Sequence, residues 1–179
     1  MHDSGVLSIF LVYFILARKV STESNFFNYQ MAEGIQILDI KDSKSFLRRK
    51  TATFDFSKFS KKDIRELILK MRKAMQAANG IGLSANQIGL NLRIFIAKPG
   101  KKLYAVFNPR IVKTSEEKIY LEEGCLSVPR VYGPVERPER IIVAASDENG
   151  GQVKYKVTGL LARVFQHEID HLDGFLFID

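Results

Sequence analysis

Apolar residues recur at helical spacing in two segments of the chain. The first helix is expected to begin at Ser60, because Ser60-Lys61-Lys62-Asp63 has the form of a capping box. The apolar positions that follow at intervals of three or four residues are Ile64, Leu67, Ile68, Met71 and Met75. Asn79-Gly80 ends this helix. A second helix is expected from about Gly159 to just before Gly174.

Runs rich in β-branched and aromatic residues lie between these helices. The expected strands cover residues 93–97, 104–108, 111–114, 118–122, 140–145 and 153–158. Asn108-Pro109 separates the expected strands 104–108 and 111–114. Glu148-Asn149-Gly150-Gly151 is a strong hairpin-turn signal. The segment 80–90, rich in small residues, fits a tight turn packed against the core. A helix, several strands and a second helix predict an α+β fold.

The first thirty residues differ from the rest. Val6–Ala17 is a nearly continuous apolar run of twelve residues, followed by Arg18-Lys19. A membrane helix needs about 20 residues, and the start of a signal peptide is normally basic. Two interpretations stay open: a weak anchor with the domain on the cytoplasmic side, or a true start at Met31. We favour the second, and divide the chain into an extension, 1–30, and a domain, 31–179.

Composition and charge narrow the class of protein. The chain has 179 residues, of which 46% are apolar and 26% charged, so one domain with an ordinary core is expected and disorder is not. The net charge of +7 comes from scattered basic residues without a nucleic-acid recognition motif. We interpret it as a solvated basic surface, with weak attraction to a polyanionic assembly as the alternative. The single cysteine, Cys125, excludes an internal disulfide.

The run Gln166–His171 contains an H-E-x-x-H motif in the second expected helix. His167 and His171 lie one turn apart on one face, so both can ligate a single metal ion. Glu168 is then placed to act as a base on a water molecule, which indicates hydrolysis. The alternative is a chance pentapeptide on a helix surface.

A third ligand should be Cys, His, Asp or Glu. The remaining histidine, His2, lies in the extension, and Asp173 is too close to His171 to serve easily. Cys125 is the best candidate, and the adjacent Gly124 allows close approach of a ligand or a substrate backbone. The alternative role for an isolated cysteine is that of a small buried hydrophobe. Judged by ligand type alone, a thiolate with two imidazoles suits zinc.

Three blocks in this order resemble the pattern of the peptide deformylases. They are Gly80–Gln87 (GIGLSANQ), Glu123–Ser127 (EGCLS) and Gln166–His171 (QHEIDH). The similarity runs from about residue 35 to the end. It implies an α+β fold with mixed or antiparallel strands around a central metal-bearing helix. It also implies removal of the formyl group from N-formyl-methionine at the start of new polypeptides.

The sequence departs from the family pattern at four places. Ser84 stands where the family usually has alanine, a small change that we expect to be tolerated. Tyr132 lies close to where several members carry an arginine that helps to hold the substrate. Many members continue into another helix beyond the position of Asp179, and the extension before Met31 has no counterpart in the usual bacterial pattern.

The resemblance implies a role for each site residue. The metal ligands are Cys125, His167 and His171. Glu168 transfers the protons, and the Gln87 side chain and the Leu126 backbone N–H stabilise the oxyanion. The implied native ion is Fe²⁺, which Zn²⁺, Ni²⁺ or Co²⁺ can replace.

The resemblance also places the substrate. The backbones of Ile81-Gly82 and of Gly124 are candidates to pair with the peptide as an added strand. An apolar methionine pocket would draw on Ile81, Leu121, Leu160 and Val164, although all four could be ordinary core residues. The implied partners are nascent formylated polypeptides, with transient ribosome association, in a bacterial cytoplasm or an organelle.

Two other functions remain open from the sequence. A metallopeptidase that cleaves internal peptide bonds would share the helix motif, and a binding protein without activity could keep the fold. Around the metal, Arg137 and Arg163 either fix nearby carboxylates or are surface residues. Asp170 is expected to cap or pair away from the metal.

Overall fold

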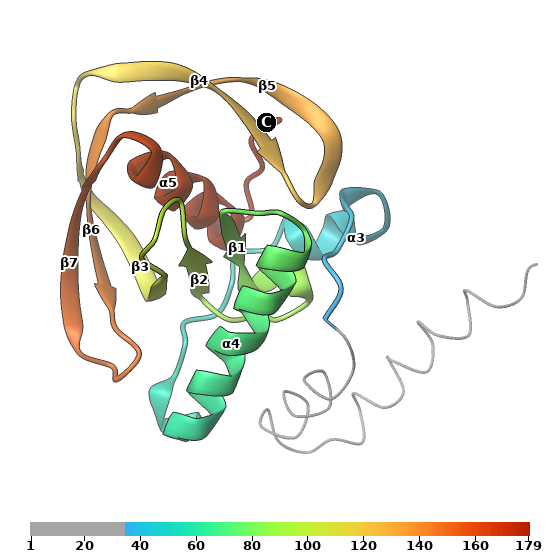
Figure 1. Ribbon diagram of the computed structural model, residues 1–179, viewed down its shortest axis with the longest axis vertical. Coiled ribbons are helices and arrows are strands. Elements are labelled where there is room, and N and C mark those ends of the chain that lie inside the picture. Colours follow the sequence, from blue (N-terminus) through green and yellow to red (C-terminus); the bar gives the residue numbers. More distant parts are fainter. Residues whose placement is uncertain (1–34) are drawn as a thin grey trace, which may run out of the picture. The chain divides into compact units, whose positions relative to one another are not determined.

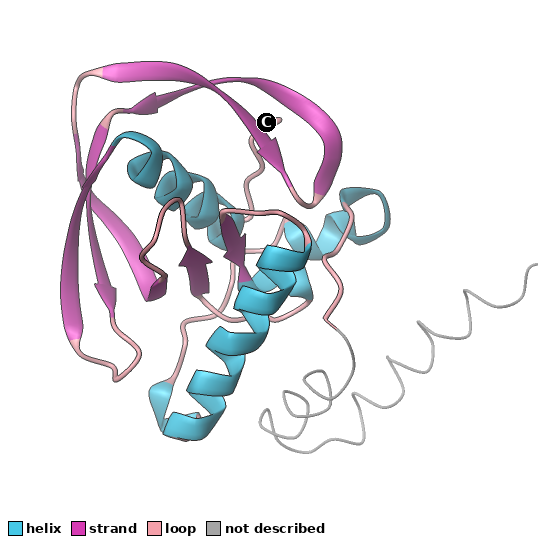
Figure 2. Ribbon diagram, in the orientation of Figure 1, coloured by secondary structure: helices cyan, strands magenta, loops and turns pink. Residues whose placement is uncertain are grey.

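The structure, a computed structural model, describes residues 35–179 of the chain, which form one compact unit. The proposed extension, residues 1–30, lies outside the described residues. Figures 1 and 2 show the helix α5 (Gly159–Asp173) in the middle of this unit, with strands around it. Between residues 35 and 179, no helix combines the length and the apolar character needed to cross a membrane.

Five strands form one antiparallel sheet, in the order β1-β2-β3-β6-β7. Their bounds are Gly82–Ser84, Ile94–Ala97, Tyr104–Thr114, Arg140–Ser146 and Gln152–Thr158. A separate antiparallel hairpin consists of β4 (Lys118–Cys125) and β5 (Val128–Pro138), and it arches over α5 in Figure 1. The predicted α+β fold around a central helix is confirmed.

Two further α-helices precede the sheet in the part of the chain that begins at residue 35. The helix α3 spans Ile40–Leu47, and α4 spans Lys61–Ala77. The capping box expected at the start of α4 is present, since Ser60 and Asp63 each bind the other's backbone N–H. The buried face of α4 carries Ile64, Leu67, Met71 and Met75, as expected from their spacing. Short 3₁₀ helices span Phe56–Lys58 and Ala85–Ile88.

The buried face of α5 meets the sheet through aromatic side chains. Phe165 is fully buried, and its ring centroid lies 5.0 Å from that of Phe95 on β2. The rings of Tyr104 and Tyr155 each lie 5.6 Å from it, in edge-on geometry. This packing fixes α5 against the sheet, so that its opposite face is turned toward the β4–β5 hairpin.

One expected break is absent from the sheet. We predicted two strands separated by Asn108-Pro109, but β3 runs unbroken from Tyr104 to Thr114. The pairing of β3 with β6 shifts in register between Phe107 and Arg110, and Asn108 has a φ of 49°. The structure therefore accommodates the proline in a bulge, where it interrupts the ladder without ending the strand.

The hairpin is longer than the sequence indicated. We expected a strand to end at residue 122, whereas β4 continues to Cys125 and pairs with β5, which we did not predict. Three prolines and a glycine in β5 obscured it: Pro129, Gly133, Pro134 and Pro138. Such residues are tolerated here because a two-stranded hairpin leaves each strand with a free edge.

Candidate metal centre

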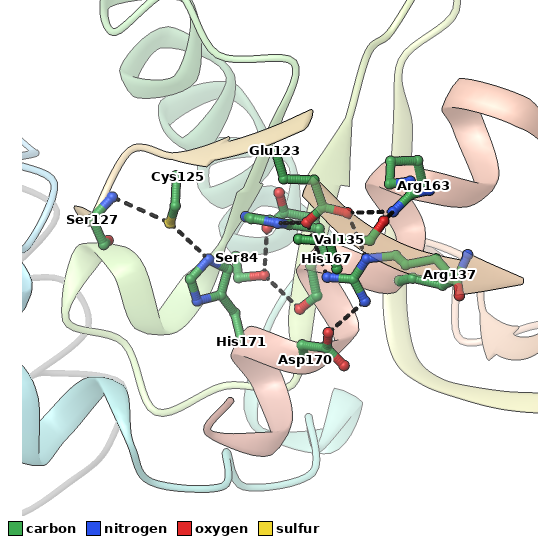
Figure 3. A network of polar contacts seen from close by, with 12 residues as sticks. Ser84, Glu123, Cys125, Ser127, Val135, Arg137, Arg163, His167, Asp170 and His171 are labelled. Atoms are coloured by element: carbon green, nitrogen blue, oxygen red, sulfur yellow. Dashed lines mark hydrogen bonds and ion pairs between the residues drawn. The ribbon is translucent and has the colours of Figure 1, made fainter. Parts of the chain in front are cut away.

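The three predicted ligands come together beside α5. His167 and His171 have ring centroids 4.9 Å apart on one face of the helix. Cys125, at the end of β4, places its Sγ 3.1 Å from Nε2 of His171 (Figure 3). One ligand atom of each of the three residues lies within 4.8 Å of the others. One sulfur and two imidazole nitrogens at this separation fit the donor set of a single metal ion.

Glu123 holds the outer nitrogen of His167. It lies two residues before Cys125 on β4, so both side chains point toward α5. Oε2 of Glu123 is 2.9 Å from Nδ1 of His167, which leaves Nε2 of that ring for a metal. Although it precedes the cysteine in the EGCLS block, Glu123 was not among the predicted site residues. The alternation of strand side chains was the signal that could have identified it.

Two arginines surround the Glu123 carboxylate. Arg137 donates to its two oxygens at 2.6 and 3.0 Å, and Arg163 donates to Oε1 at 2.9 Å. Burial acts to raise the pKa of Glu123, but hydrogen bonds from His167, Arg137 and Arg163 hold it well below its usual range. The arginines are only 8% and 5% exposed, so the alternative that they are surface residues is wrong. Asp170 pairs with Arg137 at 2.6 Å, away from the ligand atoms.

The two histidines differ in their surroundings. Burial lowers the pKa of His171 well below its usual value, which keeps this imidazole neutral, as a ligand must be. Burial also acts to lower the pKa of His167, but hydrogen bonds to Cys125 and Glu123 raise it to about 10. A cation between the three ligands would compete directly with the proton on His167.

Glu168 is buried against β1. Its exposure is 3%, and burial raises the pKa of its carboxyl to about 7. Ser84 at the end of β1 places its hydroxyl oxygen 2.7 Å from Oε2 of Glu168. A Cβ at Gly82 would collide with Oε1 of Glu168 and would lie 2.8 Å from Val164. The absence of a side chain at Gly82 therefore makes room for this carboxylate.

Gln87 reaches the centre from the short helix after β1. Its Oε1 accepts a hydrogen bond from the backbone N–H of Ser84 at 2.9 Å. This bond turns the amide so that Nε2 lies 3.2 Å from Oγ of Ser127 and 3.6 Å from Sγ of Cys125. The donor end of Gln87 thus faces the candidate metal ligands. Leu126 directly follows Cys125, and its side chain packs on Gly80.

The predicted substrate residues divide into exposed and buried ones. Ile81, Leu121 and Leu160 are 43%, 41% and 51% exposed, so they are not ordinary core residues. Val164 is 5% exposed, and the core role fits it. The backbone of Gly124 is covered by the ring of Tyr132, which is itself 69% exposed.

The geometry of this site indicates a class of protein. A buried carboxylate beside two imidazoles of an H-E-x-x-H helix and a cysteine from a neighbouring strand, within an α+β fold, is typical of a metal-dependent hydrolase.

Comparison with known proteins identifies the family. The profile described as polypeptide deformylase matches residues 35–179, and the chain belongs to this family of metalloenzymes. A peptide deformylase of Treponema pallidum (strain Nichols) is 46% identical over 116 residues, which are 65% of this chain and 72% of the relative. Relatives also include enzymes from a Synechocystis strain and from rice, where the protein is chloroplastic.

Solved structures of deformylases have the same fold. That of a probable peptide deformylase from synechococcus phage S-SSM7 is 43% identical with a TM-score of 0.74, covering 81% of this chain and 98% of the phage chain. The Thermotoga maritima enzyme is 34% identical with a TM-score of 0.75, covering 82% and 97%. A Synechococcus elongatus deformylase, 37% identical with a TM-score of 0.75 over 83% of this chain and 79% of that one, was solved in complex with actinonin.

Proposed function

We propose that Cys125, His167 and His171 hold one divalent metal ion, and that Glu168 transfers protons beside it. The reaction is the family's: removal of the formyl group from N-formyl-methionine at the start of newly made polypeptides. The observation that carries the assignment is the convergence of the three ligand atoms, within 4.8 Å of one another, next to the buried Glu168 carboxylate.

The metal ligands and Glu168 have distinct parts in the proposed reaction. A bound divalent ion supplies Lewis acidity and lowers the pKa of water toward neutrality. Glu168 accepts the proton of the attacking water and delivers it to the leaving amine. A carboxyl pKa of about 7 suits both steps, because the group gives up and takes back a proton near neutral pH.

Stabilisation of the oxyanion is assigned to Gln87 and Leu126. The bond between Gln87 Oε1 and the backbone of Ser84 directs the amide nitrogen toward Cys125, where the formyl carbon would be attacked. The backbone N–H of Leu126 is the second proposed donor. Loss of one such donor typically lowers turnover by about 10²–10³.

The substrate peptide is assigned to the surface between β1 and β4. The proposal places its backbone against Ile81-Gly82 and Gly124, by strand addition. The methionine side chain is assigned to an apolar pocket at Ile81, Leu121, Leu160 and Val164. The exposure of the first three supports contact with a ligand.

The native ion is proposed to be Fe²⁺, with Zn²⁺, Ni²⁺ or Co²⁺ able to replace it. Thiolate and imidazole donors bind all four ions, so the donor set is compatible with exchange. Metal analysis of protein purified under anaerobic conditions, on the sample used for kinetics, tests this assignment.

The cellular setting follows from the substrate. We propose that the protein acts where formylated polypeptides are made, in a bacterial cytoplasm or an organelle. Transient ribosome association is supported by the net charge of +7, since ribosomes are polyanions. Sedimentation with ribosomes that weakens as salt is added supports this proposal, and no sedimentation at low salt contradicts it.

The decisive experiment measures formate released from formyl-Met-Ala-Ser by the full chain. We expect Glu168→Ala to bind metal but to lose at least about 10²-fold in kcat, because the proton-transfer group is gone. Cys125→Ser should bind metal more weakly, because an alcohol oxygen is a poorer ligand than a thiolate. Full activity in either variant overturns the assigned site. Cleavage of casein instead of formate release supports the metallopeptidase alternative.

A further inference from the structure

The hydroxyl of Ser84 contacts the carboxylate and the main chain of the same residue. Its Oγ lies 2.7 Å from Oε2 of Glu168 and 2.9 Å from the carbonyl oxygen of Glu168. Ser84 is fully buried and Glu168 is 3% exposed, so solvent does not compete for these contacts. Both oxygens are acceptors and the hydroxyl has one proton, so the shorter contact, to Oε2, is the hydrogen bond that holds the carboxylate, with the carbonyl oxygen close beside it.

The other carboxylate oxygen is confined by the same strand. Oε1 of Glu168 occupies the space that a side chain at Gly82 would fill, next to Val164. Strand β1 therefore holds Oε1 by shape at Gly82 and Oε2 by a hydrogen bond at Ser84. A free glutamate side chain loses rotamer entropy when it is ordered, and these contacts order it before substrate arrives.

The backbone N–H of Ser84 makes a separate contact, with the side chain of Gln87. It donates to Oε1 of Gln87 at 2.9 Å. Replacing the side chain of Ser84 leaves this N–H in place. A change at the hydroxyl therefore removes the contact with Glu168 and keeps the backbone hydrogen bond to the Gln87 side chain.

We propose that Ser84 is a positioning residue for deformylation, whose hydroxyl holds the Glu168 carboxylate in its proton-transfer position. This rests on the proposed role of Glu168. Ser84 acts through that carboxylate and is not assigned any contact with the substrate. Its removal should consequently lower kcat and leave KM unchanged.

The first experiment compares side chains at position 84 in the full chain. Ser84→Ala should lower kcat about tenfold, since hydrogen bonds to charged groups are among the stronger ones, with KM within about twofold of wild type. Ser84→Thr, which keeps a hydroxyl, should restore most of the lost kcat. Ser84→Val, which has nearly the shape of the threonine variant but no hydroxyl, should not. The Thr and Val pair keeps the comparison valid if the alanine variant folds poorly.

A matched control is available in the sheet. Ser146 on β6 is 5% exposed, and its hydroxyl accepts a hydrogen bond from Gln152 at 3.0 Å. Ser146→Ala also removes a buried hydroxyl, but away from the centre, so kcat should stay unchanged. An equal loss of kcat in both alanine variants overturns the proposal, because it would show a general effect of destabilisation.

A second experiment needs neither metal nor turnover. The unfolding equilibrium of the metal-free protein is measured for wild type, Ser84→Ala, Glu168→Ala and the double variant. If the hydroxyl acts on the carboxylate, Ser84→Ala should raise the unfolding constant at least about threefold more in wild type than in the Glu168→Ala background. Equal effects in both backgrounds contradict the proposal.

The outcomes separate this proposal from the proposed function. A wild-type kcat in Ser84→Ala, beside an inactive Glu168→Ala, overturns the role of Ser84 alone. Full activity in Glu168→Ala overturns the proton-transfer role and the role of Ser84 with it. A raised KM at constant kcat in Ser84→Ala assigns the hydroxyl to substrate binding and also refutes positioning.

Discussion

Among single residues, Glu123 links a proposed metal ligand to two buried arginines. It contacts His167, Arg137 and Arg163, and its side chain is 5% exposed. One carboxylate thus orients a proposed ligand and pairs with two buried guanidinium groups, of which Arg137 also pairs with Asp170. The cost of burying three charged groups is offset only while all three stay together.

We expect Glu123→Ala to weaken both folding and metal binding. The two arginines would be left buried without their shared carboxylate, which should lower the free energy of unfolding by about 3–5 kcal/mol. Loss of the carboxylate that orients His167 should weaken metal affinity by about 10–100-fold. Urea denaturation and metal titration measure the two effects. The exposed neighbour Glu122 provides the control, Glu122→Ala, and similar losses in both variants would refute the role of Glu123.

The sequence allowed prediction of some site residues and not of others, for a physical reason. His167, Glu168 and His171 lie within one stretch of helix, so local geometry alone places them together. Glu123 and Ser84 take part through contacts with α5 that span 44 and 84 positions of the chain. Strand alternation could have placed Glu123 on the same side as Cys125, but no local pattern indicates which helix residues Glu123 and Ser84 contact. Ser84 was therefore expected only to be a tolerated replacement of alanine.

Among the elements of the fold, α4 shows that a short sequence motif can determine where a helix begins. Ser60 accepts a hydrogen bond from the N–H of Asp63 at 3.2 Å, and the carboxylate of Asp63 accepts one from the N–H of Ser60 at 2.8 Å. Both contacts join residues three positions apart, so the sequence was sufficient to predict them. The start of α4 agrees with the prediction for this reason.

We expect Ser60→Ala to lower the free energy of unfolding by about 1 kcal/mol, because the N–H of Asp63 loses its acceptor. Deformylation should be unchanged, since α4 contributes no proposed site residue. Lys61→Ala, at the exposed first position of α4, is the control and should change stability by less than about 0.5 kcal/mol. Equal stability of Ser60→Ala and wild type in urea denaturation would show that the cap contributes nothing.

The strands were harder to predict than the helices. Pro109 suggested a break, yet β3 continues through it because the bulge at Asn108 takes the proline out of the ladder. No strand was predicted at β5, which contains Pro129 and Pro134, although it pairs with β4. Whether a proline ends a strand depends on which neighbours need its N–H, and that is a property of the sheet.

At the scale of the whole molecule, residues 35–179 contain every proposed ligand and catalytic residue. The family profile matches the same range. We therefore predict that deleting residues 1–30 leaves a folded domain that releases formate at a rate within about twofold of the full chain. Thermal unfolding and formate release measure the outcome. Loss of the cooperative transition would show that the extension is needed for the fold, and would contradict a domain boundary near Met31.

The end of α5 is joined to residues far earlier in the chain. Thr51 donates from its backbone N–H and its hydroxyl to the carbonyl of Leu172, at 2.8 and 3.0 Å. Gly174, with a φ of 86°, packs against the backbone of Arg48, where a Cβ would lie 2.6 Å from the Arg48 carbonyl oxygen. Folds rich in strands and in contacts of such long sequence separation fold slowly. Distant parts of the unfolded chain must first be brought together, at a cost in entropy, before these contacts form.

This arrangement has a consequence for the protein's own biosynthesis. Cys125 leaves the ribosome well before His167 and His171, and α5 follows every strand of residues 35–179. A lone thiol holds a divalent ion poorly, and tight capture requires the three donors to be brought together by folding. If the proposed ligands hold the ion, metal can be bound tightly only after α5 has been synthesised. An enzyme that trims the beginnings of other nascent chains would thus become competent only after its own α5 has followed the described strands off the ribosome.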